Sequence, residues 1–192
     1  MTEQPRSPAC QNASPDAELA VQQQTPSWDV LQPDFERRFR RLAAEALKDR
    51  PGAGEMTLIL ADDALQQSLN RQYRGIDKST NVLAFADLDE TGGERPGEPA
   101  ILGDVVLAFE TCAREAEAQG KQLEDHALHL ALHGLLHLLG YDHDTAEEAE
   151  AMETAERQLL AKLDIADPYA EVIERRATPE GREAPLEGRA DG

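Results

Sequence analysis

Apolar and polar positions recur along much of this chain with the periods of helices and strands. Between residues 33 and 50, apolar side chains fall every three or four positions, which predicts an amphipathic helix. Pro51 and Gly52 then end it. The same reasoning predicts four further helices, over residues 62–73, 110–119, 123–139 and from 145 onward. Thr145 and Glu148 form a capping-box pattern where the last of them begins.

Shorter apolar runs predict three strands, over residues 56–60, 81–85 and 101–109. Strands are few and helices are many. This balance favours the α+β class, with a small mixed sheet covered by helices.

The two ends of the chain lack such periodicity. Residues 1–27 are rich in Gln, Ser, Pro and Ala, and residues 177–192 mix Pro, Gly, Glu and Arg. Both are expected to be disordered tails around a single domain over residues 28–176. No apolar run approaches the roughly 20 residues that cross a bilayer, and no secretory signal is visible. We therefore expect a cytoplasmic protein with no membrane partner.

The net charge of −19, from 19 basic and 38 acidic residues, disfavours diffuse binding to nucleic acid. The charge is unevenly spread, however. Residues 34–50 carry six basic and four acidic side chains, and residues 71–78 carry three basic and one acidic side chain. A locally basic strip on an acidic body could bind phosphate selectively, with an affinity that salt weakens.

The histidines carry the clearest chemical signal. All five lie between residues 126 and 143. His133 and His137 are four apart, so a helix projects both imidazoles from one face. Gly140 can end that helix in a left-handed turn that brings His143 toward the same ion. Three imidazoles and an open fourth position are typical of a catalytic zinc site, here expected at the end of a central helix.

Other polar residues near this segment are assigned lesser roles. His126 and His129 share the same helix face but lie further from Gly140, so we expect hydrogen-bonded or partly exposed histidines. Asp142 and Asp144 flank His143 and could orient the ligands from outside, although Asp144 could instead cap the next helix. Three imidazoles would also suit nickel, copper or iron.

The spacing matches the metalloprotease pattern H-E-x-x-H-x-x-G-x-x-H at every fixed position except one. Gly134 stands where that pattern has the glutamate that acts as general base. The alternative of a metal-dependent protease or another hydrolase is therefore weakened but stays open.

Three blocks of sequence together suggest a family. The segment from His133 to His143 resembles the signature of the endoribonuclease YbeY family. Residues 69–85, LNRQYRGIDKSTNVLAF, are similar to that family's stretch LNxxYRxxDxPTxVLSF, with Ser79 and Ala84 as departures. Residues 102–106, LGDVV, resemble its LGDI strand.

The resemblance implies a zinc-dependent endoribonuclease that is specific for single strands. It implies a role in maturation of the 3′ end of small-subunit ribosomal RNA and in ribosome quality control. His133, His137 and His143 would bind one Zn²⁺ per chain, and Arg74 would be the basic residue of the catalytic cleft. Expected partners are single-stranded RNA, ribosomal RNA, and the ribosome or ribosome-associated proteins, without DNA. A further alternative is a non-catalytic ribosome-associated protein whose metal only braces the last two helices.

Overall fold

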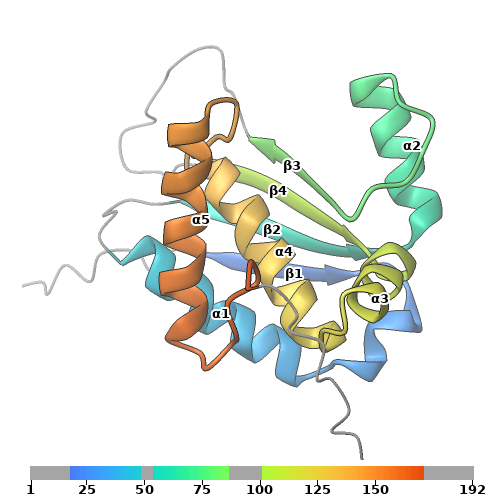
Figure 1. Ribbon diagram of the computed structural model, residues 1–192. Coiled ribbons are helices and arrows are strands. Elements are labelled where there is room, and N and C mark those ends of the chain that lie inside the picture. Colours follow the sequence, from blue (N-terminus) through green and yellow to red (C-terminus); the bar gives the residue numbers. More distant parts are fainter. Residues whose placement is uncertain (1–17, 49–53, 87–100, 171–192) are drawn as a thin grey trace, which may run out of the picture.

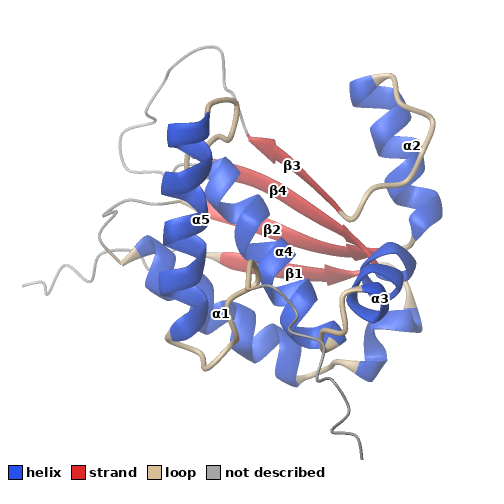
Figure 2. Cartoon of the chain, viewed as in Figure 1, coloured by secondary structure: helices blue, strands red, loops and turns tan. Residues whose placement is uncertain are grey.

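A four-stranded sheet lies at the centre of the computed structural model, which describes residues 18–48, 54–86 and 101–170 (Figures 1 and 2). Its strands are β1 (Leu19–Gln23), β2 (Glu55–Ala61), β3 (Val82–Ala86) and β4 (Ile101–Ala108). Their order is β1-β2-β4-β3, in which β3 alone runs antiparallel to its neighbour. The expected α+β fold with a small mixed sheet is confirmed.

Helices follow the predicted order between and after the strands. They are η1 (Pro26–Val30), α1 (Asp34–Leu47), α2 (Asp63–Arg74), α3 (Phe109–Ala118), α4 (Leu123–Leu138) and α5 (Ala146–Ala161). The Asp62 side chain accepts a hydrogen bond from the Leu65 amide at 2.8 Å and so caps α2. The capping box of Thr145 and Glu148 is present at the start of α5, as predicted. Within the described residues, no helix is long and apolar enough to cross a membrane.

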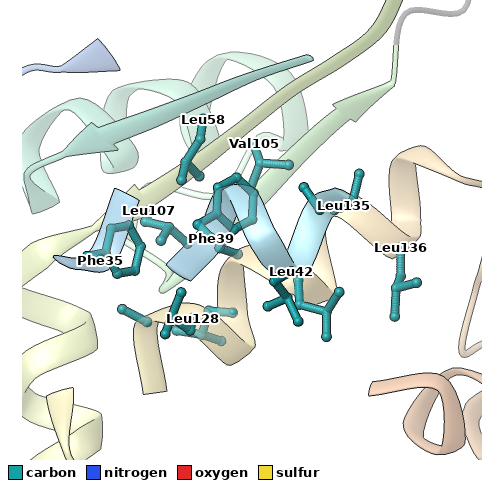
Figure 3. Packing of buried hydrophobic residues seen from close by; sticks show 14 of the residues in the cluster. Phe35, Phe39, Leu42, Leu58, Val105, Leu107, Leu128, Leu135 and Leu136 are labelled. Carbon is teal, nitrogen blue, oxygen red and sulfur yellow. The ribbon is translucent and has the colours of Figure 1, made fainter. Parts of the chain in front are cut away.

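The main core lies between the sheet and the helices α1 and α4. Leu58 of β2, together with Val105 and Leu107 of β4, faces Phe39 of α1 and Leu135 of α4 (Figure 3). All five side chains are fully buried. Each such burial contributes about 1.5–3 kcal/mol. This contact fixes α4, the helix that carries the histidines, against the middle of the sheet.

The contact between α4 and β4 is unusually close at Gly134. A Cβ atom built there would lie 2.5 Å from Cγ1 of Val105, closer than real side chains approach. Glycine therefore lets α4 lie directly on the strand.

Helix α2 lies on the opposite face of the sheet. Ala84 of β3 packs on the main core, so the next residue, Phe85, points to the other face. There the ring of Phe85 contacts the ring of Tyr73 of α2, with 4.9 Å between their centroids. The last turn of α2 therefore lies against β3, on the other face of the sheet from α4.

The prediction of a disordered N-terminal tail over residues 1–27 is wrong for the final third of that range. Residues 19–23 form β1, which pairs with β2 in parallel, and η1 begins at Pro26. Trp28 is fully buried, and its Nε1 donates to the Ala61 carbonyl at 2.9 Å. The polar residues around it hid this short strand, and its hydrogen-bond partners come from β2, about 37 residues further along the chain. Residues 1–17, the loop expected over 90–99, the boundary at 176 and the tail over 177–192 lie outside the described residues.

Candidate metal centre

Three histidines from the end of α4 and the following turn lie together. One ring nitrogen from each of His133, His137 and His143 lies within 4.8 Å of the other two. The Nε2 atoms of His133 and His137 are 3.1 Å apart. Two nitrogens bound tetrahedrally to one zinc would be about 3.3 Å apart. The predicted trio therefore has a spacing that could hold one ion.

The turn that brings His143 back is built by Gly140. This glycine has a φ of +85°, in the left-handed region that side chains disfavour. Its amide donates to the His137 carbonyl, and the Tyr141 amide donates to the Leu136 carbonyl, both at 3.0 Å. These two bonds are a Schellman motif, which ends α4 and reverses the chain. The predicted role of Gly140 is confirmed.

Hydrogen bonds at the outer ring nitrogens orient His133 and His137, the two histidines of the trio that lie on α4. His133 Nδ1 lies 2.8 Å from Oε1 of Glu156, and His137 Nδ1 lies 3.1 Å from the Tyr141 carbonyl oxygen. A carbonyl or an ionised carboxylate can only accept, so both Nδ1 atoms must donate. In the neutral imidazoles, the Nε2 lone pairs are then left for an ion. Burial, followed by the neighbouring His133 and His143, lowers the pKa of His137, which favours this neutral form.

Glu156 of α5 is a residue of this site that the sequence analysis missed. It is fully buried and contacts His133, His129 and the Tyr169 hydroxyl. Burial alone raises the pKa of its carboxyl, but hydrogen bonds from the two histidines and then from Tyr169 outweigh it and hold the pKa at about 2. The carboxylate is therefore ionised at neutral pH.

A sequence signal for Glu156 did exist. Met152, Glu156 and Leu160 are four residues apart on α5, and all three are buried. A single acidic residue on the buried stripe of an amphipathic helix indicates a partner that needs a carboxylate.

The other two histidines of α4 are hydrogen-bonded, as expected. His126 Nε2 lies 3.0 Å from Glu115 of α3, and His129 Nε2 lies 3.0 Å from Glu156. His126 is only 4% exposed, and burial lowers its pKa despite the nearby Glu115. Neither belongs to the three-histidine group.

The remaining predicted residues do not touch the imidazoles. Asp142 accepts a hydrogen bond from the backbone amide of His143 at 2.8 Å, so it braces the turn. Asp144 is exposed, and Thr145 rather than Asp144 caps α5. Arg74 is exposed in the last turn of α2, and in the described chain no contact joins it to the three histidines.

The fold and this site define a class: a small α+β protein whose three clustered histidines could hold a metal ion. Comparison with known proteins narrows the class. The family described as "Endoribonuclease YbeY" matches residues 20–164. The chain belongs to the endoribonuclease YbeY family, as the sequence blocks indicated.

Individual relatives agree with this placement. The endoribonuclease YbeY of Paramagnetospirillum magneticum is 56% identical over 158 residues, which cover 80% of this chain and 96% of the relative. The endoribonuclease YbeY of Rhodospirillum rubrum is 48% identical over 163 residues, which cover 80% of this chain and 82% of the relative. A solution structure of a Thermotoga maritima protein covers 80% of this chain and 99% of its own, with a TM-score of 0.53 and 20% identity. This last likeness concerns the fold alone.

Proposed function

We propose that this protein is a single-strand-specific metallo-endoribonuclease that acts in maturation of the 3′ end of small-subunit ribosomal RNA and in ribosome quality control. The observation that carries the proposal is the grouping of His133, His137 and His143, with the first two presenting Nε2 to each other at 3.1 Å. Family membership supports RNA as the substrate. We further propose a cytoplasmic location and the ribosome or its associated proteins as partners, with neither DNA nor membrane.

The donor set suits one Zn²⁺ per chain. Three imidazoles bind the ion and leave a fourth position for water or substrate, whereas structural zinc sites are closed by four protein ligands. When bound, zinc supplies Lewis acidity and makes water easier to deprotonate near neutral pH. His143 is exposed, so the open side of the group can be reached from solvent.

The end of α2 has the features of a surface that binds single strands. Arg71 and Arg74 occupy its last turn, and Tyr73 between them is 61% exposed while its ring rests on Phe85. Arginines attract the phosphate backbone, and exposed aromatic rings stack on unpaired bases. We propose that Arg74 binds a phosphate of the RNA strand, since its planar fork matches the phosphate oxygens.

Peptide hydrolysis fits the site less well. Position 134 has no side chain, and the space beside it is filled by Val105. A glutamate there would meet β4, so this helix packing excludes the general base that the protease pattern requires. Within the described residues, Glu156 is the carboxylate that touches a ligand, and its two oxygens already accept hydrogen bonds.

The proposal is tested by cleavage of a labelled single-stranded RNA. We compare the intact protein, the protein after chelation, the chelated protein after zinc is restored, and His137→Ala. Only the first and third samples are expected to cut. A DNA strand of the same sequence and casein serve as alternative substrates and are expected to stay intact.

Arg74→Ala separates substrate binding from metal binding. We expect weaker cleavage with unchanged zinc content, while Lys162→Ala, which removes a half-exposed cation beyond the end of α5 paired with Glu45, serves as the control. RNA cleavage that is equal in all samples would mark a contaminant and overturn the proposal. Loss of casein cleavage on chelation, independent of Arg74, would establish the protease instead. Zinc binding without cleavage of any substrate would favour the non-catalytic binding protein.

A further inference from the structure

A single buried carboxylate contacts two neighbouring histidines of α4 through different ring nitrogens. Oε1 of Glu156 lies 2.8 Å from Nδ1 of His133, and Oε2 lies 3.0 Å from Nε2 of His129. His129 and His133 are one helical turn apart, and their rings meet edge to face at 6.4 Å. The two residues therefore share one partner but offer it opposite edges of the imidazole.

This difference fixes opposite tautomers. A carboxylate accepts and does not donate, so each histidine nitrogen that touches Glu156 must carry the proton. In the neutral ring, His133 then keeps its lone pair on Nε2, which lies 3.1 Å from Nε2 of His137. In neutral His129, Nε2 carries the proton, and the lone pair is left on Nδ1, which is buried. A metal ion held by His133, His137 and His143 can therefore bind the Nε2 lone pair of His133 but not the buried lone pair of His129.

We propose that Glu156 is a positioning residue that selects which histidines of α4 bind the metal. By accepting from Nδ1 of His133, it turns the Nε2 lone pair of that residue toward the ion. By accepting from Nε2 of His129, it keeps that residue out of the coordination sphere. This inference rests on the proposed metal site, and it adds a residue of α5 that spacing within α4 does not reveal.

Tyr169, beyond the end of α5, holds the carboxylate in place. Its hydroxyl donates to Oε2 of Glu156, the oxygen that also accepts from His129. Its ring packs edge to face with that of His129 at 5.6 Å, and the guanidinium of Arg157 lies over the Tyr169 ring, 4.8 Å from its centroid. Because both oxygens of Glu156 are engaged from fixed elements, the carboxylate cannot turn to exchange its two histidines.

The test compares Glu156→Gln with the wild-type chain. Glutamine has nearly the same shape but offers one acceptor oxygen and one amide NH2 group that donates, so its two ends cannot both accept from the histidines. Glu153→Gln is the matched control, because Glu153 lies one turn earlier on α5 and pairs with Arg157 instead. The first readout is the tautomer of His129 and His133 in the metal-free proteins, from imidazole ¹⁵N chemical shifts. The second is zinc affinity, by competition with a chromophoric chelator.

We expect wild type and Glu153→Gln to show a proton on Nδ1 of His133 and on Nε2 of His129. In Glu156→Gln, at least one of these assignments should change, and zinc affinity should fall about 10- to 100-fold. Tyr169→Phe keeps the ring but removes one donor, and we expect a smaller loss of affinity in the same direction. Glu156→Asp keeps the charge with a shorter reach, so its affinity should lie between those of wild type and Glu156→Gln.

A purely structural role for Glu156 would give a different result. Glu156→Gln would then melt earlier in chelator, but both tautomers and the zinc affinity would stay within about twofold of wild type. That outcome would overturn the inference. If Glu156→Gln does not fold, unchanged zinc affinity in both Glu156→Asp and Tyr169→Phe would overturn it equally. A protein that binds zinc as expected but cuts no RNA would overturn the proposed function and leave this inference standing.

Discussion

The two halves of α4 carry histidines on the same face, but the structure uses them differently. In the first half, His126 and His129 present Nε2 to Glu115 and Glu156 at 3.0 Å each. In the second half, His133 and His137 are held through Nδ1, by Glu156 and by the Tyr141 carbonyl. Their Nε2 atoms are left to face each other. The first half is tied to α3 and α5, and the second half forms the candidate metal centre.

This contrast shows that residue type and helical spacing do not decide which histidines can bind a metal. All four have the right spacing for one face of a helix. The neighbour that each imidazole meets decides which nitrogen keeps its lone pair. Carboxylates on α3 and α5 therefore divide a row of similar residues into those that tie helices together and those of the candidate metal centre.

The largest expected effect comes from making the same substitution in both halves. His137→Gln removes one of the three proposed ligands, so zinc affinity should fall by at least about 100-fold, more than the loss of a residue that only hydrogen-bonds to a ligand costs. His126→Gln keeps a side-chain N–H that can donate to Glu115, so zinc affinity should stay within about twofold of wild type. Both values are measured by chelator competition at one pH. Equal losses in the two variants would show that the halves do not differ in the way described.

The next largest expected effect concerns how closely the second half of α4 lies on the sheet. Gly134→Ala places a methyl group 2.5 Å from Val105 Cγ1, so something must move. Overpacking costs about 1–3 kcal/mol, and the better helix propensity of alanine offsets up to about 1 kcal/mol. We expect a net loss of about 1–2 kcal/mol in the free energy of unfolding of the metal-free protein.

A double-mutant cycle identifies the contact. In the background of Val105→Ala, which removes the two methyl groups in the way, Gly134→Ala should cost clearly less. Denaturant unfolding of the four proteins in chelator supplies the comparison. Additive losses would mean that Val105 is not what requires glycine at this position.

Much of this arrangement could be predicted from the sequence because it depends on local signals. Helix periodicity, the Asp62 and Thr145 caps and the left-handed Gly140 all act within a few residues of one another. The three histidines of the candidate metal centre lie in one segment of 11 residues, from His133 to His143, so spacing alone was enough to group them.

What the sequence analysis missed depends on contacts between distant segments. Strand β1 is a short apolar run, Leu19 to Val21, followed by two glutamines, and its pairing partner β2 lies about 37 residues further along the chain. Glu156 reaches His133 from 23 residues away and on another helix, whereas the acidic residues adjacent in sequence, Asp142 and Asp144, do not touch the rings. Proximity along the chain was a poor guide to which carboxylate contacts a histidine of the candidate metal centre.

The smallest expected effect is a pH dependence that belongs to the first half of α4. Burial lowers the pKa of His126 below its ordinary value of 6.5, against the opposing effect of Glu115, while His129 and Lys121 lower it further. The folded state thus binds fewer protons than the unfolded state, so stability is full above pH 6.5 and falls as the pH drops toward the lowered pKa. His126→Gln removes this group but keeps a donor for Glu115.

In chelator, the free energy of unfolding of this variant should therefore fall less than that of wild type between pH 7.5 and pH 5.5. The difference should stay below about 1.4 kcal/mol per pH unit, the limit for one proton. Since His137 also has a lowered pKa, the variant should keep part of the wild-type dependence. Identical pH profiles would mean that His126 takes up its proton in the folded state as readily as in the unfolded chain, and that the first half of α4 is not closed to water as its burial indicates.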